Sequence, residues 1–174
     1  MTVSETKNSQ GILAVLDHYP LPIPDNLSFT LILDSIRDPG NLGTLLRTAT
    51  AAGAQAVFLP PETTDAFAPK VVRAGMGAHF HLPIWSLSWD EIHTRLAGLN
   101  VYLAEMDGPV SCWQADFRSP LALIIGGEAD GASEHGRRLA NRLVSIPMPG
   151  KAESLNAAMA GAILMFEVVR QRKS

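Results

Sequence analysis

The sequence predicts an α/β fold, a mostly parallel sheet with helices on both of its faces. Three observations predict it. Short apolar runs bounded by turn residues recur along the chain, as expected of buried strands. Between them lie segments of helical character, two of which are followed by a glycine. The two kinds of segment alternate, which is typical of parallel sheets because each parallel pair of strands needs a crossover connection.

The first half of the chain begins with an extended arm. Residues 1–28 are polar at first and then carry three prolines, so we interpret them as an arm or the end of a linker, and residues 29–174 as the folded domain. The run FTLILD at 29–34 is suited to a buried strand, and turn residues follow it. The remaining expected elements are a helix at 42–52 ended by Gly53, a strand at 56–59, a short helix at 70–76, a strand-like stretch at 81–84 and a helix at 89–97.

The second half continues the alternation. A strand is expected at 101–104, and the strongly apolar LALII at 121–125 is a further strand that runs into a glycine-rich loop. A helix at 134–140 and a strand at 144–146 follow, and a last helix is expected at 154–170. A chain of 174 residues with these elements is long enough for one domain with a substantial core.

Composition excludes several classes of protein. No apolar run reaches the roughly 18 residues that a membrane helix needs, and the N-terminus lacks the features of a signal peptide, so we expect a cytoplasmic protein without a membrane partner. The single cysteine, Cys112, excludes an internal disulfide, and the five histidines form no metal-binding pair, so no metal is expected. The net charge of −3 means that any RNA contact must be local, shared across a dimer or assisted by another domain.

Three loops stand where strands of the predicted sheet end. They are DPGNLG at 38–43, GGEADG at 126–131, and PMPG at 147–150, which leads to ESLN at 153–156. Ligands of open α/β sheets bind outside the carboxyl ends of the strands, and glycines allow the backbone to approach a ligand closely. The sequence therefore predicts a ligand site built from these loops.

Each polar residue of these loops also has a purely structural interpretation. Asn41 could be the N-cap of the helix at 42–52, and Arg47 could be a solvated helix residue. Glu128 could cap the following helix, and Ser154 or Asn156 could cap the last one. The structural interpretation of Arg137, and of the other arginines in the second half of the chain, is that they lie on a solvent-exposed face. No segment matches the GxGxxG fingerprint, which disfavours dinucleotide binding.

Taken together, the loops resemble a known family. The segments LILDSIRDPGNLGTLLRTATAAGAQAVFL, LALIIGGEADGAS and VSIPMPGKAESLNAAMAGAILMFEVVRQR are similar to the three motifs of the SpoU (TrmH) family in the SPOUT superfamily of methyltransferases, in the same order. The resemblance implies an enzyme that transfers a methyl group from S-adenosylmethionine to a ribose 2'-hydroxyl of RNA. It also implies a deep C-terminal trefoil knot and a homodimer.

The resemblance assigns roles by position. The residues that match the family's catalytic positions are Asn41, Arg47, Glu128, Ser154 and Asn156. The donor is expected against the backbone near Leu103, Gly126, Ile146, Met148 and Leu155. One mild departure is Ala157–Ala158, where many relatives carry Val-Ser.

The front of the chain departs further from the family. The segment SQGILAVLDHYP resembles the junction that follows a separate N-terminal RNA-binding domain in many relatives. We therefore interpret this chain as a catalytic domain that has been separated from such an RNA-binding domain. That junction favours ribosomal RNA over transfer RNA as the substrate.

The expected mechanism centres on Arg47. An arginine is very hard to deprotonate, so we expect Arg47 to hold the target phosphate and ribose and to stabilise developing alkoxide charge rather than to act as a base. Glu128 and Asn41 would orient Arg47, and Ser154 and Asn156 would position the third loop. The alternatives are a transfer RNA methyltransferase, another nucleotide-binding enzyme such as a dehydrogenase, and a non-catalytic module on the same fold. A non-catalytic module would be expected to have lost Arg47, Glu128 or Asn156, and all three are present.

Overall fold

The sheet has seven strands, and every pair of neighbours in it is parallel. The computed structural model of the chain describes residues 17, 20–128 and 131–173. The strands lie in the order β3-β2-β1-β6-β4-β7-β5. Their bounds are β1 Phe29–Asp34, β2 Ala56–Leu59, β3 Ile84–Ser86, β4 Asn100–Ala104, β5 Val110–Ser111, β6 Leu121–Gly126 and β7 Arg142–Ser145.

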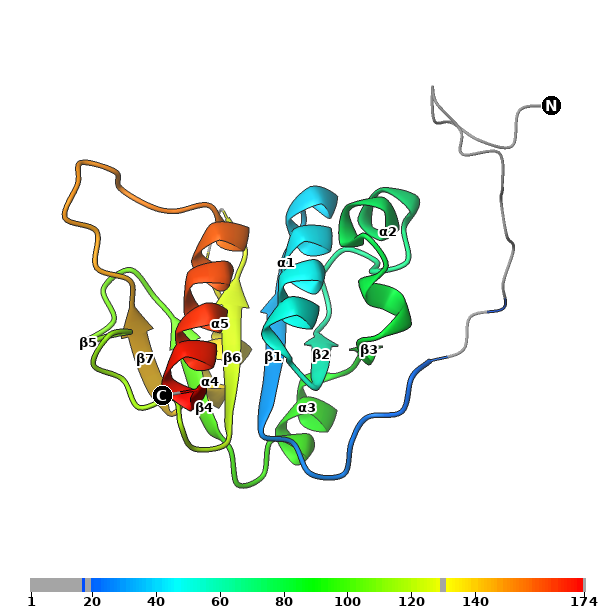
Figure 1. Cartoon of the computed structure of the whole chain (residues 1–174), viewed down its shortest axis with the longest axis horizontal. Coiled ribbons are helices and arrows are strands. Elements are labelled where there is room, and N and C mark those ends of the chain that lie inside the picture. Colours follow the sequence, from blue (N-terminus) through cyan, green and yellow to red (C-terminus); the bar gives the residue numbers. More distant parts are fainter. Residues whose placement is uncertain (1–16, 18–19, 129–130, 174) are drawn as a thin grey trace.

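Helices cover both faces of this sheet. They are α1 Pro39–Ala52, α2 Pro69–Gly75, the 3₁₀ helix η1 Ala78–Phe80, α3 Trp89–Arg95, α4 Glu134–Leu139 and α5 Ala157–Lys173. Helices α1, α2 and α5 lie on one face and α3 and α4 on the other (Figure 1). Side chains of strand β1 pack on both faces of the sheet. Leu31 and Leu33 pack on the face covered by α1 and α5, whereas Ile32 packs with Ile92 of α3 on the other face. This confirms the expected α/β architecture.

The central strands β1 and β6 mark a reversal in the order of the sheet. The chain builds β2 and β3 on one side of β1, and then places the later strands on the other side. The two strands pair over their whole length, from Phe29 beside Leu121 to Asp34 beside Gly126. In open parallel sheets a ligand crevice forms at such a switch point, outside the carboxyl ends of the strands.

Glycines allow helix α1 to pack closely against its two neighbours. A Cβ atom on Gly43 would lie 2.5 Å from the Cβ of Ala74 in α2, and one on Gly161 of α5 would lie 2.5 Å from Cδ2 of Leu45. Because a Cβ on Gly43 would also lie 2.7 Å from the backbone oxygen of Val71, this position requires glycine unless the helices separate, whereas a Cβ on Gly161 would require the Leu45 side chain to move. The tight packing fixes the start of α1 beside the carboxyl edge of the sheet.

The structure corrects several expected boundaries. Helix α1 begins earlier than expected, and its N-cap is Asp38, whose carboxylate accepts from the backbone N of Asn41 at 2.8 Å; the N-cap interpretation of Asn41 was wrong. The third strand follows η1 at 84–86 rather than 81–84, and β7 ends at Ser145. Helix α5 starts at Ala157, and the two-residue strand β5 was not predicted.

Most of the expected N-terminal arm lies outside the described residues. Its described end is extended and packs on the α3 side of the sheet, where Ile23 and Leu27 contact the core. The indole Nε1 of Trp85 donates to the carbonyl of Leu21 at 2.8 Å. In the described part of the chain, none of the helices is both long and apolar enough to cross a membrane.

Candidate functional site

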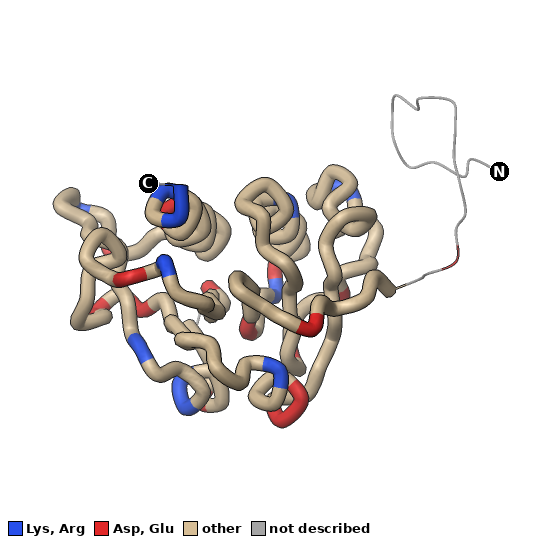
Figure 2. Tube along the Cα trace, turned by 60° about the horizontal axis from the view of Figure 1, so that its bottom comes forward, with Lys and Arg blue, Asp and Glu red and all other residues tan. Residues whose placement is uncertain are grey.

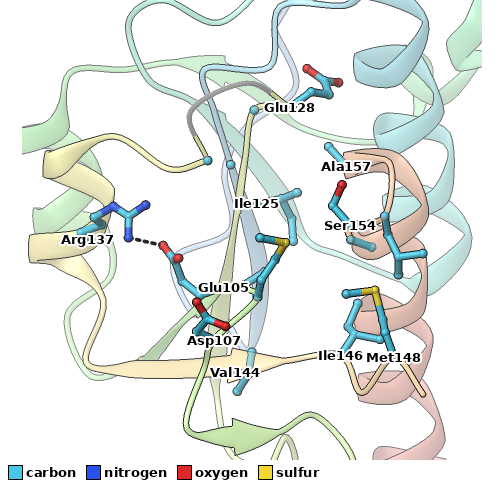
Figure 3. Close-up of a pocket in the computed structure, with 17 residues that line it drawn as sticks. Glu105, Asp107, Ile125, Glu128, Arg137, Val144, Ile146, Met148, Ser154 and Ala157 are labelled. Carbon is cyan, nitrogen blue, oxygen red and sulfur yellow. Dashed lines mark ion pairs between the residues drawn. The ribbon is translucent and has the colours of Figure 1, made fainter. Parts of the chain in front are cut away.

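A cavity of about 430 Å³ opens at the carboxyl edge of the sheet, a volume in the range of small-molecule sites. Three segments far apart in sequence form most of its lining: the loop after β4, the glycine loop after β6, and the connection from β7 into α5 (Figure 3). The loops singled out at 126–131 and 147–156 thus meet around one space.

The cavity contains most of the residues expected to contact a methyl donor. Gly126, Ile146, Met148 and Leu155 line it. Leu103 does not, since it is fully buried with the α3 side of the core, but the next residue, Ala104, lies at the cavity. The role of these residues as donor contacts remains a prediction.

Three of the expected catalytic residues form one hydrogen-bonded chain. The side-chain amide of Asn156 donates to Oδ1 of Asn41 at 3.1 Å, and the amide of Asn41 in turn donates to Oε1 of Glu128. Asn156 and Asn41 are 115 positions apart in sequence, and Asn41 and Glu128 are 87 positions apart. Glu128 itself lines the cavity.

The start of α5 fixes the direction of this chain. Oδ1 of Asn156 accepts from the backbone N atoms of Ala158 and Met159, at 2.9 and 3.3 Å, so Asn156 is the residue that caps α5. Because its oxygen is used by the helix, its amide group must point toward Asn41. Asn41 Oδ1 accepts this hydrogen bond. The NH2 group of Asn41 therefore points the other way and donates to an acceptor, which here is the Glu128 carboxylate. Local helix capping therefore orients a carboxylate at the cavity.

Ser154 and Arg47 occupy different places. Ser154 lines the cavity just before α5 (Figure 3). Arg47 is exposed on α1 and does not line the cavity, and its side chain makes no hydrogen bond or ion pair with any described residue. The structure thus joins Asn41 and Glu128 to each other, and not to Arg47 as the expected mechanism would have it.

The loop after β6 is glycine-rich because it packs closely on backbone. A Cβ atom on Gly126 would lie 2.3 Å from the backbone N of Ala132, and one on Gly127 would lie 2.4 Å from the carbonyl oxygen of Ser35. Ser35 follows β1 directly, so these glycines hold the loop across the ends of the two central strands. Glu128 is thereby fixed beside the start of α1.

Sequence reasoning missed a charged group at the cavity. Glu105 lies there with Asp107, and an Nη1 atom of Arg137 is 2.5 Å from Oε1 of Glu105 (Figure 3). Arg137 is therefore not simply part of a solvated face. The missed signal was available, because Glu105 and Asp107 follow a predicted strand just as the three recognised loops do. Among the described residues, no three His, Cys, Asp or Glu side chains gather to hold a metal ion.

Comparison with known proteins shows extensive similarity. The model of the SpoU rRNA methylase family matches residues 28–166. The mitochondrial rRNA methyltransferase 3 of Xenopus laevis is 36% identical over 92% of this chain and 54% of its own length. The 23S rRNA (guanosine-2'-O-)-methyltransferase of Shewanella oneidensis is 37% identical over 94% of this chain and 68% of its own. The chain thus spans between about half and two thirds of the length of these curated relatives.

Solved structures agree with this result. The AdoMet-bound rRNA methyltransferase from Sinorhizobium meliloti matches 88% of this chain and 62% of its own length, with a TM-score of 0.80 and 36% identity. A structure described as giving insight into the 2-OH methylation of C/U34 on tRNA matches 84% of this chain and 97% of its own length, with a TM-score of 0.75 and 31% identity.

Proposed function

The chain belongs to the SpoU rRNA methylase family, and on that premise we propose that it transfers a methyl group from S-adenosylmethionine to a ribose 2'-hydroxyl of ribosomal RNA. The observation that carries this proposal is the hydrogen-bonded chain Asn156–Asn41–Glu128, which directs a carboxylate to the edge of the cavity. The names of the relatives, which describe 2'-O-methylation of ribosomal RNA, support the reaction and the substrate.

The cavity fits the methyl donor chemically. Its apolar lining includes Ile125, Ile146 and Leu155, suited to an adenine ring, and the glycine loop presents backbone groups for hydrogen bonding. The carboxylate of Asp107 suits a cationic ligand, whereas that of Glu105 is already paired with Arg137. S-adenosylmethionine, when bound there, supplies a methyl group already activated by a sulfonium charge. A solved relative with AdoMet bound supports this choice of cofactor.

The chain's own residues then have to position and activate the acceptor. A ribose hydroxyl is a poor nucleophile, so the protein must align it with the methyl group and stabilise the negative charge that develops on its oxygen. Glu128 is placed to accept a hydrogen bond at the cavity edge, and Asn41 and Asn156 hold it there. We assign Arg47 to the phosphate and ribose of the acceptor, which reach it from outside the donor cavity.

Two further features implied by the family belong to the same proposal. A homodimer is supported by a stripe on α5, where Met159 and Phe166 are 51% and 49% exposed and Ile163 lies between them at helical spacing. A C-terminal trefoil knot belongs to the proposal through the family alone.

Transfer RNA is the second candidate substrate. It is favoured by the relative whose structure concerns tRNA position 34, since this chain matches 97% of that protein's length but much less of the ribosomal RNA enzymes. The experiment that separates the two is methyl transfer from radiolabelled S-adenosylmethionine to unmodified transcripts of ribosomal and transfer RNA. Label in ribosomal RNA alone is the expected result, label in transfer RNA alone would reverse the assignment, and label in neither would contradict the proposed function.

A further inference from the structure

Helix α2 and the turn that follows it carry an unusual surface. Between Asp65 and Asp90 the chain has no acidic residue, although its net charge is −3. Four side chains of this stretch, Lys70, Arg73, Met76 and Phe80, are exposed, and we call them together the α2 surface. A local excess of cations on an acidic protein is the kind of feature that recruits a polyanion.

The cations of the α2 surface have no charged partners. Lys70 and Arg73 make no ion pair with any described residue, whereas arginines elsewhere on the molecule do. In the view of Figure 2, blue and red residues are interspersed over the trace rather than separated into faces. The positive charge at α2 is therefore available to an external anion, whereas five of the ten arginines of the chain are held in ion pairs with described residues.

The apolar members of the surface are held outward by the backbone. Met76 is 70% exposed and Phe80 is 66% exposed. Met76 and Gly77 both have positive φ, at 47° and 90°, so the chain turns sharply between α2 and η1. Behind them, His79 is anchored by a 2.7 Å hydrogen bond to Ala66 and an edge contact with Phe67. Exposed apolar and aromatic groups beside cations suit the faces of unstacked bases, which single-stranded RNA offers.

The position of the α2 surface relates it to Arg47. Gly43 of α1 packs directly on α2 at Ala74 and Val71. Arg47 follows Gly43 by one helical turn and so lies on the same side of α1, toward α2. The two helices also lie side by side in Figure 1. The α2 surface and the arginine assigned to the acceptor thus belong to two helices that pack directly on each other.

From these observations we propose that the α2 surface docks the single-stranded RNA segment that flanks the target nucleotide. Lys70 and Arg73 bind its phosphates, and Phe80 and Met76 pack against its bases. The inference rests on the proposed function, because it concerns the acceptor of that reaction. It also explains how an acidic domain holds RNA without a basic face.

The test measures binding of a labelled single-stranded RNA of about 20 nucleotides, longer than the ~4–16 nucleotides that a single-strand site covers. Fluorescence anisotropy at several salt concentrations is compared for the wild-type chain, Lys70→Ala/Arg73→Ala and Phe80→Ala. Loss of two phosphate contacts should reduce the slope of log affinity against log salt by about 1.4. Loss of one stacking platform should weaken binding by roughly 10-fold at fixed salt.

Matched controls come from other parts of the molecule. Arg95 is an exposed arginine of α3 on the opposite face of the sheet, and Trp113 is an aromatic side chain that is 53% exposed. Arg95→Ala and Trp113→Ala should leave RNA binding unchanged. Calorimetric titration with S-adenosylmethionine shows whether each variant keeps an intact donor site, and all should bind as the wild type does.

Three results would overturn the inference. They are absence of RNA binding by the wild-type chain, equal losses in the controls, and unchanged binding in the α2 variants. A change in sedimentation with unchanged RNA binding would show that the α2 surface contacts a second copy instead. RNA binding that depends on the α2 surface, without any methyl transfer, would support the docking surface while contradicting the proposed function.

Discussion

At the scale of single residues, Asn156 links helix formation to the site. Its oxygen caps α5, and its amide group orients Asn41 and through it Glu128. The sequence predicted that one residue of the third loop would be a cap, and that the three polar loops would converge, because parallel strands end at one edge. It could not predict the hydrogen bonds themselves, since these depend on how residues more than 80 positions apart are brought together.

Two substitutions of Asn156 separate its roles. Asn156→Asp keeps an acceptor for the N atoms of Ala158 and Met159 but loses the donor to Asn41, so stability should be retained while transfer slows by roughly 100-fold. Asn156→Ala loses both, and should also lower the free energy of unfolding by about 1 kcal/mol. Urea unfolding and single-turnover rates measure the two effects. Full activity of the aspartate variant would refute the orienting role.

Arg47 should act on the acceptor and not on the donor. It lies outside the cavity, so Arg47→Ala should leave donor affinity nearly intact while reducing methyl transfer about 100- to 1,000-fold. Arg47→Lys should rescue poorly, because a point charge does not reproduce the planar guanidinium. Donor affinity and single-turnover rate are measured on the same protein. If both collapse together, Arg47 belongs to the donor site.

At the scale of elements, the apolar runs were enough to locate β1, β2 and β6, and the final helix was found with its start displaced. The failures have physical causes. β5 has only two residues and no apolar pattern of its own, so it exists through its pairing with β7. The sequence predicts a strand at 81–84, but Leu82 is buried in the turn after η1 and the strand begins only at Ile84.

The last helix carries a charge network with a testable pH dependence. Glu167 is only 4% exposed and accepts from both Arg170 and Gln171. The hydrogen bonds from Arg170 hold the pKa of Glu167 below its ordinary value of 4.5, so its contribution to stability is complete above that pH and is lost as the pH falls through the lower folded pKa.

Glu167→Gln should therefore lower the free energy of unfolding near neutral pH by about 1 kcal/mol, a modest value because Arg170 is largely exposed. The difference from the wild type should shrink as the pH is taken well below 4.5. Urea unfolding at neutral and acidic pH measures it. A difference that stays constant with pH would show that the network contributes through packing and not through charge.

At the scale of the whole molecule, the exposed stripe on α5 bears on assembly. A homodimer that buries Met159 and Phe166 should dissociate when Phe166 is replaced by Glu, since a carboxylate would then have to lie in an apolar contact. Sedimentation velocity should show a dimer for the wild type and a monomer for Phe166→Glu. Trp113→Glu, at an exposed aromatic outside this stripe, is the control and should remain dimeric. A monomeric wild-type chain would contradict the proposed assembly.

The whole molecule is proposed to carry out one reaction, methylation of a ribose hydroxyl in ribosomal RNA. Mass-spectrometric mapping of 2'-O-methylation, in cells with and without the gene, tests it most directly. A copy of the gene that carries Arg47→Ala serves as the matched control, because the folded domain should survive the change. We predict that one 2'-O-methylated nucleotide of ribosomal RNA disappears with the gene, returns with the wild-type copy and does not return with the Arg47 variant. An unchanged 2'-O-methylation pattern in ribosomal RNA would contradict the proposed function.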